Sequence, residues 1–315
     1  MMTSREKILA YKTWRQRIRL EDGLYTMGYL NMPNEWEFNY MPDRLDGKSF
    51  LDVGSNDGYF PLEAEQRGAS RSVATDLYYD GPNGNVGGWN VEGIKLLRLH
   101  FQSKIEIASK SIYDLHEFNN KFDVVLCSNV ISWLDNINEA IAQLCGICDD
   151  TLFIKDGFLT RFDPEPVLQY EKGKGLVAFR ANLSYIREVL RVNGFNHIEI
   201  KPIFTYQYFD WQTDTFPSVK TDKEIQIFTL PDETKAEGKL NCRNAWKVSE
   251  IGNFSFIKNI GWVRTSDIEV APRSVQSIPG KLLRGMLSEN QYTDYIRKKG
   301  EENYVKSYMV IAKRG

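Results

Sequence analysis

A glycine-containing turn follows a short expected strand that runs from Ser49 to Val53. Gly54 and Gly58 stand in this turn, and Asp76 ends the next apolar run along the chain. Glycine lets the backbone approach a ligand closely. An acidic side chain at the end of the neighbouring strand accepts hydrogen bonds from ribose hydroxyls in dinucleotide-type folds. The spacing therefore predicts a nucleoside site at the carboxyl edge of a parallel sheet.

The same turn lacks the features of a phosphate site. A pyrophosphate loop carries a third glycine in the spacing G-x-G-x-x-G, whereas this turn has only Gly54 and Gly58. No Lys-Ser or Lys-Thr pair follows Gly58, so a P-loop for nucleoside triphosphates is not supported. The turn therefore favours a nucleoside without phosphates.

The elements that must position this turn form a repeating pattern from Gly47 onward. Short apolar runs alternate with helical stretches, which indicates βαβ units and a parallel sheet. An amphipathic helix is expected from Leu183 to Asn193, with Gly194 as its C-terminal cap. Strands are expected at about 49–53, 72–76, 104–108, 123–128, 151–155 and 198–203, and a last buried strand at 307–312.

The remaining segments predict additions to this core. Apolar residues at three- and four-residue spacings in 5–20 predict an amphipathic helix. Residues 211–304 carry short β-like runs at 224–230, 253–258 and 260–264 and interrupt the core before its last strand. We therefore expect four parts: an N-terminal helix and aromatic lid segment (1–45), the nucleoside-binding core (46–210), an insertion or substrate subdomain (211–304), and the last core strand (305–315).

Composition and charge narrow the class of protein. The 315 residues include 40 Lys and Arg against 42 Asp and Glu, so no overall basic field is present to hold a polyanion. Residues 1–20 lack the apolar centre of a signal peptide, and no window approaches 18 uninterrupted apolar residues. We expect a cytoplasmic protein without membrane association. Cys145 and Cys148 have the spacing of zinc ligands, but no second pair follows, so no metal site is expected.

The residues from Leu51 to Gly58, followed by Asp76, resemble the first two motifs of the class I S-adenosylmethionine-dependent methyltransferase superfamily. The resemblance implies an α/β fold: a Rossmann-like seven-stranded methyltransferase sheet with an antiparallel last strand, here with an N-terminal helical extension and an insertion before that strand. It also implies S-adenosyl-L-methionine as cofactor. The family pattern is G-x-G-x-G, and Asn56 stands at its middle glycine, which narrows the loop slightly and leaves the backbone contact in place.

Segments 48–76 and 177–182 are most similar to the wobble-uridine tRNA methyltransferase-like group, which includes small-molecule and sugar methyltransferases. The superfamily resemblance also implies which residues contact the cofactor. Ser111 takes a place where many members carry an acidic residue that recognises the adenine amino group. The residues expected at the cofactor are Asp52, Gly54, Ser55, Asn56, Asp57, Gly58, Tyr59, Asp76, Leu77, Ser111, Ile112, Asn129 and Val130.

Methyl transfer depends mostly on alignment, because the sulfonium carbon is already activated and a general base is optional. Asp156, expected just past the fifth strand, is one candidate base, and a turn residue before Gly157 is the other interpretation. His100 is the second candidate, although a packing or surface role explains it more simply. The residues expected to contact an acceptor are Trp36, Trp133, Arg180 and Asn182, and the aromatics Tyr11, Trp14, Tyr25, Tyr29 and Tyr40 either cover it or pack in the core.

Three functions are compatible with this sequence. The first is methylation of a hydroxyl group, or less simply an amine, on a small metabolite such as a sugar or secondary metabolite. The second is modification of tRNA at a wobble uridine, with the basic residues of 5–19 on the phosphates. The third is a catalytically silent cofactor-binding subunit that uses 211–304 as its interface. A homo-oligomer is compatible with each.

Overall fold

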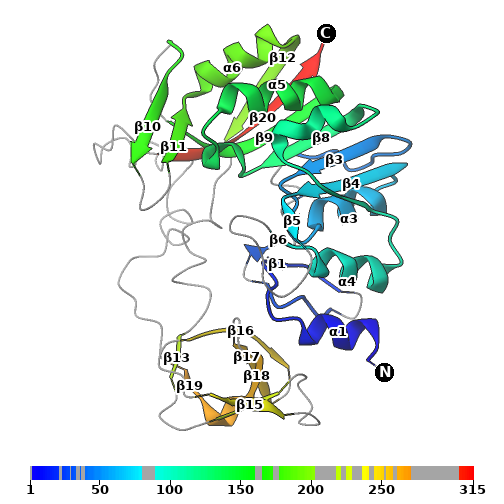
Figure 1. Ribbon diagram of the computed structural model, residues 1–315, viewed down its shortest axis with the longest axis vertical. Helices are drawn as coiled ribbons and strands as arrows, with labels where there is room; N and C mark the ends of the chain where they lie inside the picture. The colour runs from blue at the N-terminus through cyan, green and yellow to red at the C-terminus, as the bar shows by residue number, and fades with distance from the viewer. Residues whose placement is uncertain are drawn as a thin grey trace. The chain divides into compact units, whose positions relative to one another are not determined.

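The computed structural model describes residues 2–20, 23–28, 30–32, 36, 40–79, 89–159, 165–172, 177–202, 218–220, 225–228, 236–240, 245–251, 253–257, 261–270 and 305–315 (Figure 1). The chain forms two compact units. The first unit comprises Met1–Asn34, Gly93–Gln102 and Tyr206–Tyr295. The second comprises Glu35–Glu92, Ser103–Thr205 and Ile296–Gly315. Each unit contains its own seven-stranded sheet. The four parts expected from the sequence therefore divide the chain differently from these units.

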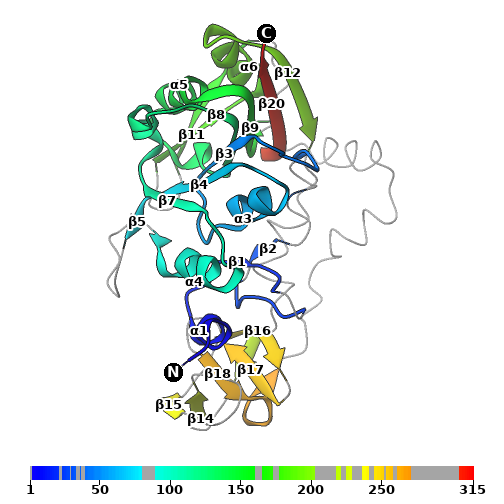
Figure 2. The same cartoon turned by 90° about the vertical axis from the view of Figure 1, so that its right-hand side faces the viewer.

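The sheet of the second unit has the strand order β12-β20-β9-β8-β3-β4-β7, with β7 labelled in Figure 2 and the other six strands in Figure 1. Neighbouring strands run parallel except at β20, which is antiparallel to both β12 and β9. This confirms the expected α/β class, a Rossmann-like seven-stranded sheet with a reversed last strand. The strand bounds are β3 Ser49–Val53, β4 Arg71–Asp76, β7 Glu106–Ser109, β8 Phe122–Ser128, β9 Cys148–Leu159, β12 Phe195–Pro202 and β20 Val305–Arg314.

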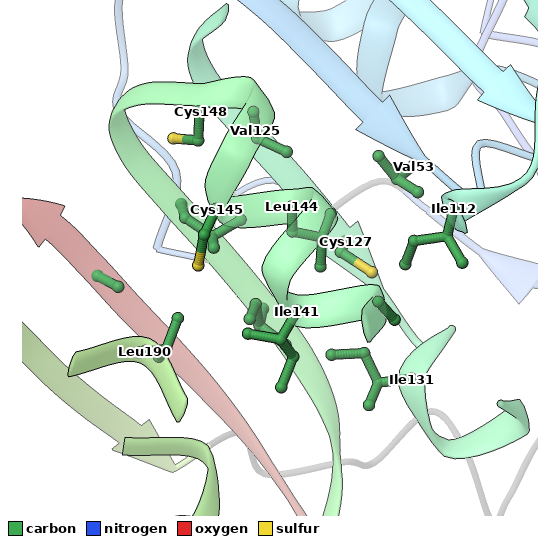
Figure 3. Packing of buried hydrophobic residues seen from close by; sticks show 14 of the residues in the cluster. Val53, Ile112, Val125, Cys127, Ile131, Ile141, Leu144, Cys145, Cys148 and Leu190 are labelled. Carbon is green, nitrogen blue, oxygen red and sulfur yellow. The ribbon is translucent and has the colours of Figure 1, made fainter. Parts of the chain in front are cut away.

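Helices pack on both faces of this sheet. α3 (Tyr59–Gln66) lies on one face, and α5 (Ile137–Ile147) and α6 (Leu183–Val192) lie on the other (Figure 2). The core between α5, α6 and the strands consists of fully buried aliphatic side chains such as Ile141, Leu144 and Leu190 (Figure 3). α6 follows its expected course, ending at the C-cap Asn193, with Gly194 at φ +88°. The short 3-10 helices η1 (Ile112–Glu117) and η2 (Ile131–Trp133) complete the connections after β7 and β8.

Strand β9 is longer than its sequence pattern predicts. It was expected at about 151–155, but it runs from Cys148 to Leu159. β8 pairs with it only as far as Lys155, whereas β20 continues the pairing from Thr151 to Leu159. The last part of β9 is therefore held by a strand that follows it by some 150 residues of sequence. A small antiparallel hairpin, β10 (Leu168–Lys172) and β11 (Val177–Ala181), lies before α6.

The N-terminal segment is mostly extended, which corrects the helix predicted over 5–20. α1 begins after a capping box formed by Thr3 and Glu6 and ends at Ala10. Beyond it the buried side chains alternate along the chain as Trp14, Gln16, Ile18 and Leu20. Alternation with a period of two is the burial pattern of a strand. In agreement, β1 (Gln16–Arg17) pairs in parallel with β2 (Leu30–Asn31).

The first unit contains the second sheet, whose strand order is β15-β14-β18-β17-β16-β13-β19 and whose pairings are antiparallel. Trp262 of β18 is fully buried, and its Nε1 donates to the carbonyl oxygen of Leu9 in α1 at 2.9 Å. The bounds are β13 Ser218–Lys220, β14 Ile225–Phe228, β15 Ala236–Leu240, β16 Ala245–Ile251, β17 Phe254–Ile257, β18 Gly261–Arg264, β19 Glu269–Val270 and α4 Glu92–Phe101. Of the short runs expected here, residues 224, 229–230, 258 and 260 lie outside the described residues.

No helix among the described residues is long and apolar enough to cross a membrane. Cys127, Cys145 and Cys148 are free and buried, and the last two lie in the core shown in Figure 3. Burial raises the pKa of the Cys145 and Cys148 thiols to about 12. Their spacing therefore reflects packing where α5 meets β9.

Arg314 fastens the end of β20 to the junction of α5 and β9. Its Nη2 donates to the carbonyl oxygen of Cys145 at 2.6 Å, and its Nε donates to that of Cys148 at 3.1 Å. Its guanidinium carbon also lies 4.6 Å from the centroid of the Phe195 ring. This one side chain therefore satisfies two carbonyl groups that end the helix and begin the strand.

We predict that Arg314→Ala lowers the free energy of unfolding by about 1–3 kcal/mol, because partly buried carbonyl groups lose their donors. Urea unfolding followed by circular dichroism measures the change. Lys313→Ala is the matched control, since Lys313 is exposed on the same strand. Equal losses in the two variants would show that Arg314 has no special role.

Candidate functional site

The turn between β3 and α3 has an unusual backbone. Gly54, Asn56 and Gly58 all have positive φ angles, of +85°, +52° and +89°. The amides of Gly54 and Ser55 donate to the carbonyl oxygen of Thr75 in β4, at 2.9 and 3.1 Å. A Cβ atom on Gly54 would lie 2.2 Å from Cγ2 of Val130, so any side chain here would collide with the segment after β8. The turn is thus a tight feature held between two neighbouring strands.

Asp76, at the end of β4, closes this turn. Its Oδ2 accepts a hydrogen bond from the amide of Asn56 at 2.9 Å, and its Oδ1 accepts one from the amide of Leu77 at 2.8 Å. A carboxylate oxygen can accept more than one hydrogen bond, such as one from a ligand hydroxyl. The two residues that the sequence analysis placed together, Asp76 and the glycine turn, are brought into direct contact.

Tyr78 is a site residue that the sequence analysis missed. Its hydroxyl donates to the carbonyl oxygen of Asn56 at 2.9 Å, and the Ser109 hydroxyl donates to the backbone carbonyl of Tyr78. Burial, followed by the charge of Asp76, raises the pKa of Tyr78 well above its usual value, so it remains a neutral donor. Its only signal in the sequence is an aromatic residue two positions after the acidic strand end.

Three buried oxygen atoms, one at the end of β3 and two in the turn, make no hydrogen bond of good geometry in the described structure. They are Oδ2 of Asp52, Oγ of Ser55 and Oδ1 of Asn56. Burial raises the pKa of Asp52 to about 8, with the Ser55 hydroxyl opposing this shift and the charge of Asp76 adding to it. Buried polar atoms normally have partners. Buried polar atoms beside a bare glycine backbone fit a polar ligand that carries hydroxyl and amino groups.

The other residues expected at the cofactor differ in exposure. Asp57 and Tyr59 are 6% and 4% exposed, whereas Leu77 is 50% exposed and presents an apolar side chain at this edge. Ser111 caps η1 by accepting from the amide of Tyr113 at 3.3 Å, which leaves its hydroxyl proton for another partner. Ile112 is buried in the core with Leu51 and other strand residues. The cofactor contacts of these residues stay predictions.

Asn129 and Val130 follow β8 and face the turn from the neighbouring strand. Asn129 has a φ of +58°, and its amide donates to the carbonyl oxygen of Lys155 at 2.7 Å. Val130 supplies the methyl group that occupies the space beside Gly54. Both residues therefore lie at the carboxyl edge where the sequence analysis placed them.

Asp156 lies within β9, one residue beyond the pairing with β8, and is 3% exposed. Its Oδ2 accepts from the amide of Ser132 at 2.9 Å and its Oδ1 from that of Gly157 at 2.7 Å. Burial raises its pKa, while these amides and the nearby Arg180 oppose the shift. The carboxyl group thus fastens η2 to β9. Its role as a general base stays a prediction.

The four residues expected at an acceptor have different surroundings. Trp133 is 61% exposed, on η2. Arg180 is half-buried, and its Nη1 donates to the carbonyl oxygen of Gly157 at 3.4 Å and lies 3.9 Å from Oδ1 of Asp156. Trp133 is thus the candidate that offers a large open surface.

Trp36 and Asn182 are engaged in the fold itself. Trp36 is 1% exposed, donates from Nε1 to the carbonyl oxygen of Pro42 at 3.0 Å, and lies against Phe50. Asn182 caps α6 by accepting from the amide of Tyr185 at 2.9 Å. We expected both side chains to contact an acceptor, and these contacts correct that expectation. The Trp36 ring is buried by packing, and the Asn182 carboxamide caps α6.

His100, the second candidate base, belongs to the first compact unit. Its Nδ1 lies 3.3 Å from the hydroxyl of Ser4, and its ring packs edge to face with Phe101. These contacts are those of a packing residue. Within the described residues, no group of three His, Cys, Asp or Glu side chains is arranged to hold a metal ion. Tyr29, one of the aromatics expected near an acceptor, lies outside the described residues.

The raised pKa of Asp52 predicts a pH dependence of stability. The carboxyl pKa is 3.8 in the unfolded reference and about 8 in the fold. Stability from the protonated group is therefore full below about pH 4 and is lost as the pH rises through about 8. We expect the free energy of unfolding of Asp52→Asn to exceed that of the wild type by an amount that grows from about pH 5 to about pH 8 and then levels off.

Urea unfolding at a series of pH values tests this expectation. Asp46→Asn is the matched control: Asp46 is exposed, and its hydrogen bond with Arg44 holds its pKa below the usual range, so it is ionised in both states throughout the series. A difference between Asp52→Asn and the wild type that stays constant with pH would show that Asp52 is ionised in the fold.

Residues 36–157 match the family model described as a methyltransferase domain, and this segment contains the turn, Asp76, Asn129 and Asp156. A comparison with curated protein sequences gave no significant match. Among solved structures, the chain is similar to magnesium protoporphyrin IX methyltransferase from Synechocystis PCC 6803 with bound S-adenosylmethionine, at 17% identity over 52% of this chain and 67% of that one, with a TM-score of 0.39.

Two further structures have similar values. An S-adenosylmethionine-dependent methyltransferase from Mesorhizobium loti is 16% identical over 52% of this chain and 83% of that one, with a TM-score of 0.39. A putative S-adenosylmethionine-dependent methyltransferase from Listeria monocytogenes is 15% identical over 58% and 92%, with a TM-score of 0.39. The family match coincides with the part of the sheet that carries the turn. Residues 36–157 are therefore similar to a methyltransferase domain.

Proposed function

We propose that this enzyme transfers the methyl group of S-adenosylmethionine to a hydroxyl group of a small metabolite, such as a sugar or a secondary metabolite. The observation that carries the proposal is the exposed ring of Trp133, which lies three residues after Val130, the residue in contact with Gly54. An acceptor bound on this ring would lie beside the edge of the sheet where the cofactor is expected. The near balance of 40 basic and 42 acidic residues favours a small acceptor over a polyanion.

Trp133 has the properties of a stacking surface for such an acceptor. The backbone beneath it is fixed, because the Trp133 amide donates to the carbonyl oxygen of Val130 at 3.0 Å and Asp156 holds the amide of Ser132. Large aromatic rings contribute much contact area and have few rotatable bonds, so little conformational freedom is lost on binding. A ring of this kind suits the apolar face of a sugar or a flat secondary metabolite.

Alignment supplies most of the catalysis in this proposal. When bound, the cofactor supplies an electrophilic methyl carbon on its sulfonium. The rigid turn and η2 hold the two reacting groups in line, which converts a bimolecular encounter into a positioned one. Asp156 is our candidate for the general base that accepts the proton of the acceptor hydroxyl. Burial raises its pKa, which makes its carboxylate a stronger base than that of an exposed Asp. Arg180, at 3.9 Å, supports the ionised form.

The alternative acceptor is tRNA, which basic residues of the N-terminal segment would have to bind. In the first unit the half-buried Arg17 lies over the ring of Tyr25, with Cζ 4.8 Å from the ring centroid. This observation is not specific for phosphate. We therefore retain tRNA as one arm of the test and place the small acceptor first.

Isotope-labelled S-adenosylmethionine distinguishes the two acceptors. The purified enzyme is incubated with a panel of hydroxylated sugars and secondary metabolites in one arm and with unmodified tRNA in the other, and the products are identified by mass spectrometry. We expect methyl incorporation in the first arm. Incorporation into tRNA alone, together with retention on tRNA at moderate salt, would overturn the small-acceptor proposal.

Trp133→Ala is predicted to raise the KM for the acceptor by about 10-fold, which corresponds to about 1.4 kcal/mol of lost stacking. The Kd for S-adenosylhomocysteine is expected to stay unchanged, because the ring lies on the acceptor side. Val192→Ala is the matched control, since Val192 is an exposed apolar residue on α6 with 79% exposure. An unchanged KM in Trp133→Ala would remove Trp133 from the acceptor site.

Gly54→Ala is predicted to weaken the binding of S-adenosylhomocysteine by at least about 10-fold. A residue with a Cβ atom is strained at a positive φ, and the added atom displaces the turn. The new Cβ would meet Val130 Cγ2 at 2.2 Å. Adding Val130→Ala should therefore recover part of the loss, since it removes the collision but not the strain. Calorimetric titration measures both variants. Normal affinity in Gly54→Ala alone would show that the turn tolerates a side chain.

A further inference from the structure

Asn56 occupies the position of the middle glycine of the G-x-G-x-G pattern. Its φ of +52° is in the left-handed region, which asparagine tolerates better than most residues that carry a side chain. The backbone therefore keeps the conformation that a glycine would adopt, and a carboxamide is added to the turn. The question is what this added group does.

Three of the four polar groups of Asn56 have partners within the turn. Its amide donates to Oδ2 of Asp76 at 2.9 Å, and its carbonyl oxygen accepts from the Tyr78 hydroxyl at 2.9 Å. Its Nδ2 donates to the carbonyl oxygen of Gly54 at 3.0 Å, which fixes the orientation of the carboxamide. The fourth group, Oδ1, is buried and makes no hydrogen bond of good geometry in the described structure. The turn therefore presents one oriented acceptor.

The charge around this acceptor favours a cationic donor. The carboxylate of Asp76 accepts from the Asn56 amide at 2.9 Å, and its charge is one cause of the raised pKa of Tyr78. A negative potential of this kind attracts a positively charged group more strongly than a neutral hydroxyl. The cofactor carries such a group, the ammonium of its amino-acid part.

We propose that Oδ1 of Asn56 accepts a hydrogen bond from the ammonium group of the cofactor, so that Asn56 is a specificity-determining residue for its amino-acid part. The inference uses the cofactor and is independent of the acceptor. A buried acceptor without a partner is unfavourable, and a charged donor would relieve that cost. The hydrogen bond from Nδ2 to Gly54 holds Oδ1 in place before the cofactor arrives.

The test uses two ligands that differ in one group: S-adenosylhomocysteine and its analogue with hydrogen in place of the amino group. Calorimetric titration gives the Kd of each for the wild type, Asn56→Gly and Gln102→Gly. Glycine keeps the positive φ and both backbone hydrogen bonds of Asn56 and removes only the carboxamide. Gln102→Gly is the matched control, because Gln102 is exposed and has a φ of +51° far along the chain from the turn.

We expect Asn56→Gly to bind S-adenosylhomocysteine about 10-fold more weakly than the wild type, since a hydrogen bond to a charged group is lost. The analogue should bind both proteins with affinities within about 2-fold, so the loss depends on the amino group, as in a double-mutant cycle. Gln102→Gly should bind both ligands like the wild type. Equal losses for the two ligands in Asn56→Gly, or no loss for either, would overturn the proposal.

A second variant keeps the test decisive if Asn56→Gly folds poorly. Asn56→Asp retains an acceptor oxygen and a residue that tolerates positive φ, and it lacks the Nδ2 donor. We expect it to keep the preference for S-adenosylhomocysteine over the analogue, and loss of that preference would contradict the role of the oxygen. Failure of the wild type to bind S-adenosylhomocysteine would overturn the cofactor assignment, and this proposal with it.

Discussion

The two hydrogen bonds accepted by Asp76 are the interactions on which the cofactor site depends. One carboxylate holds the amide of Asn56, in the turn after β3, and the amide of Leu77, at the end of β4. It therefore joins the carboxyl ends of two parallel strands, and it fixes Asn56 in a conformation that most residues avoid. The Tyr78 hydroxyl closes the same arrangement from the other side. A site built on backbone groups in this way is rigid before any ligand binds.

A carboxyl group also holds backbone amides at the carboxyl ends of β8 and β9. Val130 packs into the space that Gly54 leaves open, and Asp156 holds the amide of Ser132. A carboxyl group thus holds a backbone segment twice, once on each side of β3. Because both fastened segments lie at carboxyl ends of neighbouring strands, cofactor and acceptor are expected at a common edge, as in other open α/β sheets.

The sequence predicted those features that depend on local pattern. β3 lies at 49–53 as expected, because its apolar residues directly precede the glycine turn, and the turn was identified because glycine spacing and Asp76 are local signals. The extension of β9 to Leu159 was not predictable, since it depends on pairing with β20 far along the chain. The helix over 5–20 was wrong because apolar residues at mixed spacings obscured the two-residue alternation that burial reveals.

The exposed fraction separates the candidate acceptor residues in a way that their residue types do not. Trp36 and Trp133 are equally suited to stacking as residue types, yet Trp36 is 1% exposed and Trp133 is 61% exposed. Nothing in the sequence around either residue distinguishes them, because exposure is decided by which segments pack on each ring. Cofactor recognition uses backbone and short polar side chains in one turn, whereas acceptor recognition uses side chains gathered from distant elements. Which aromatic side chain is open to an acceptor therefore depends on long-range packing, which the sequence around it does not encode.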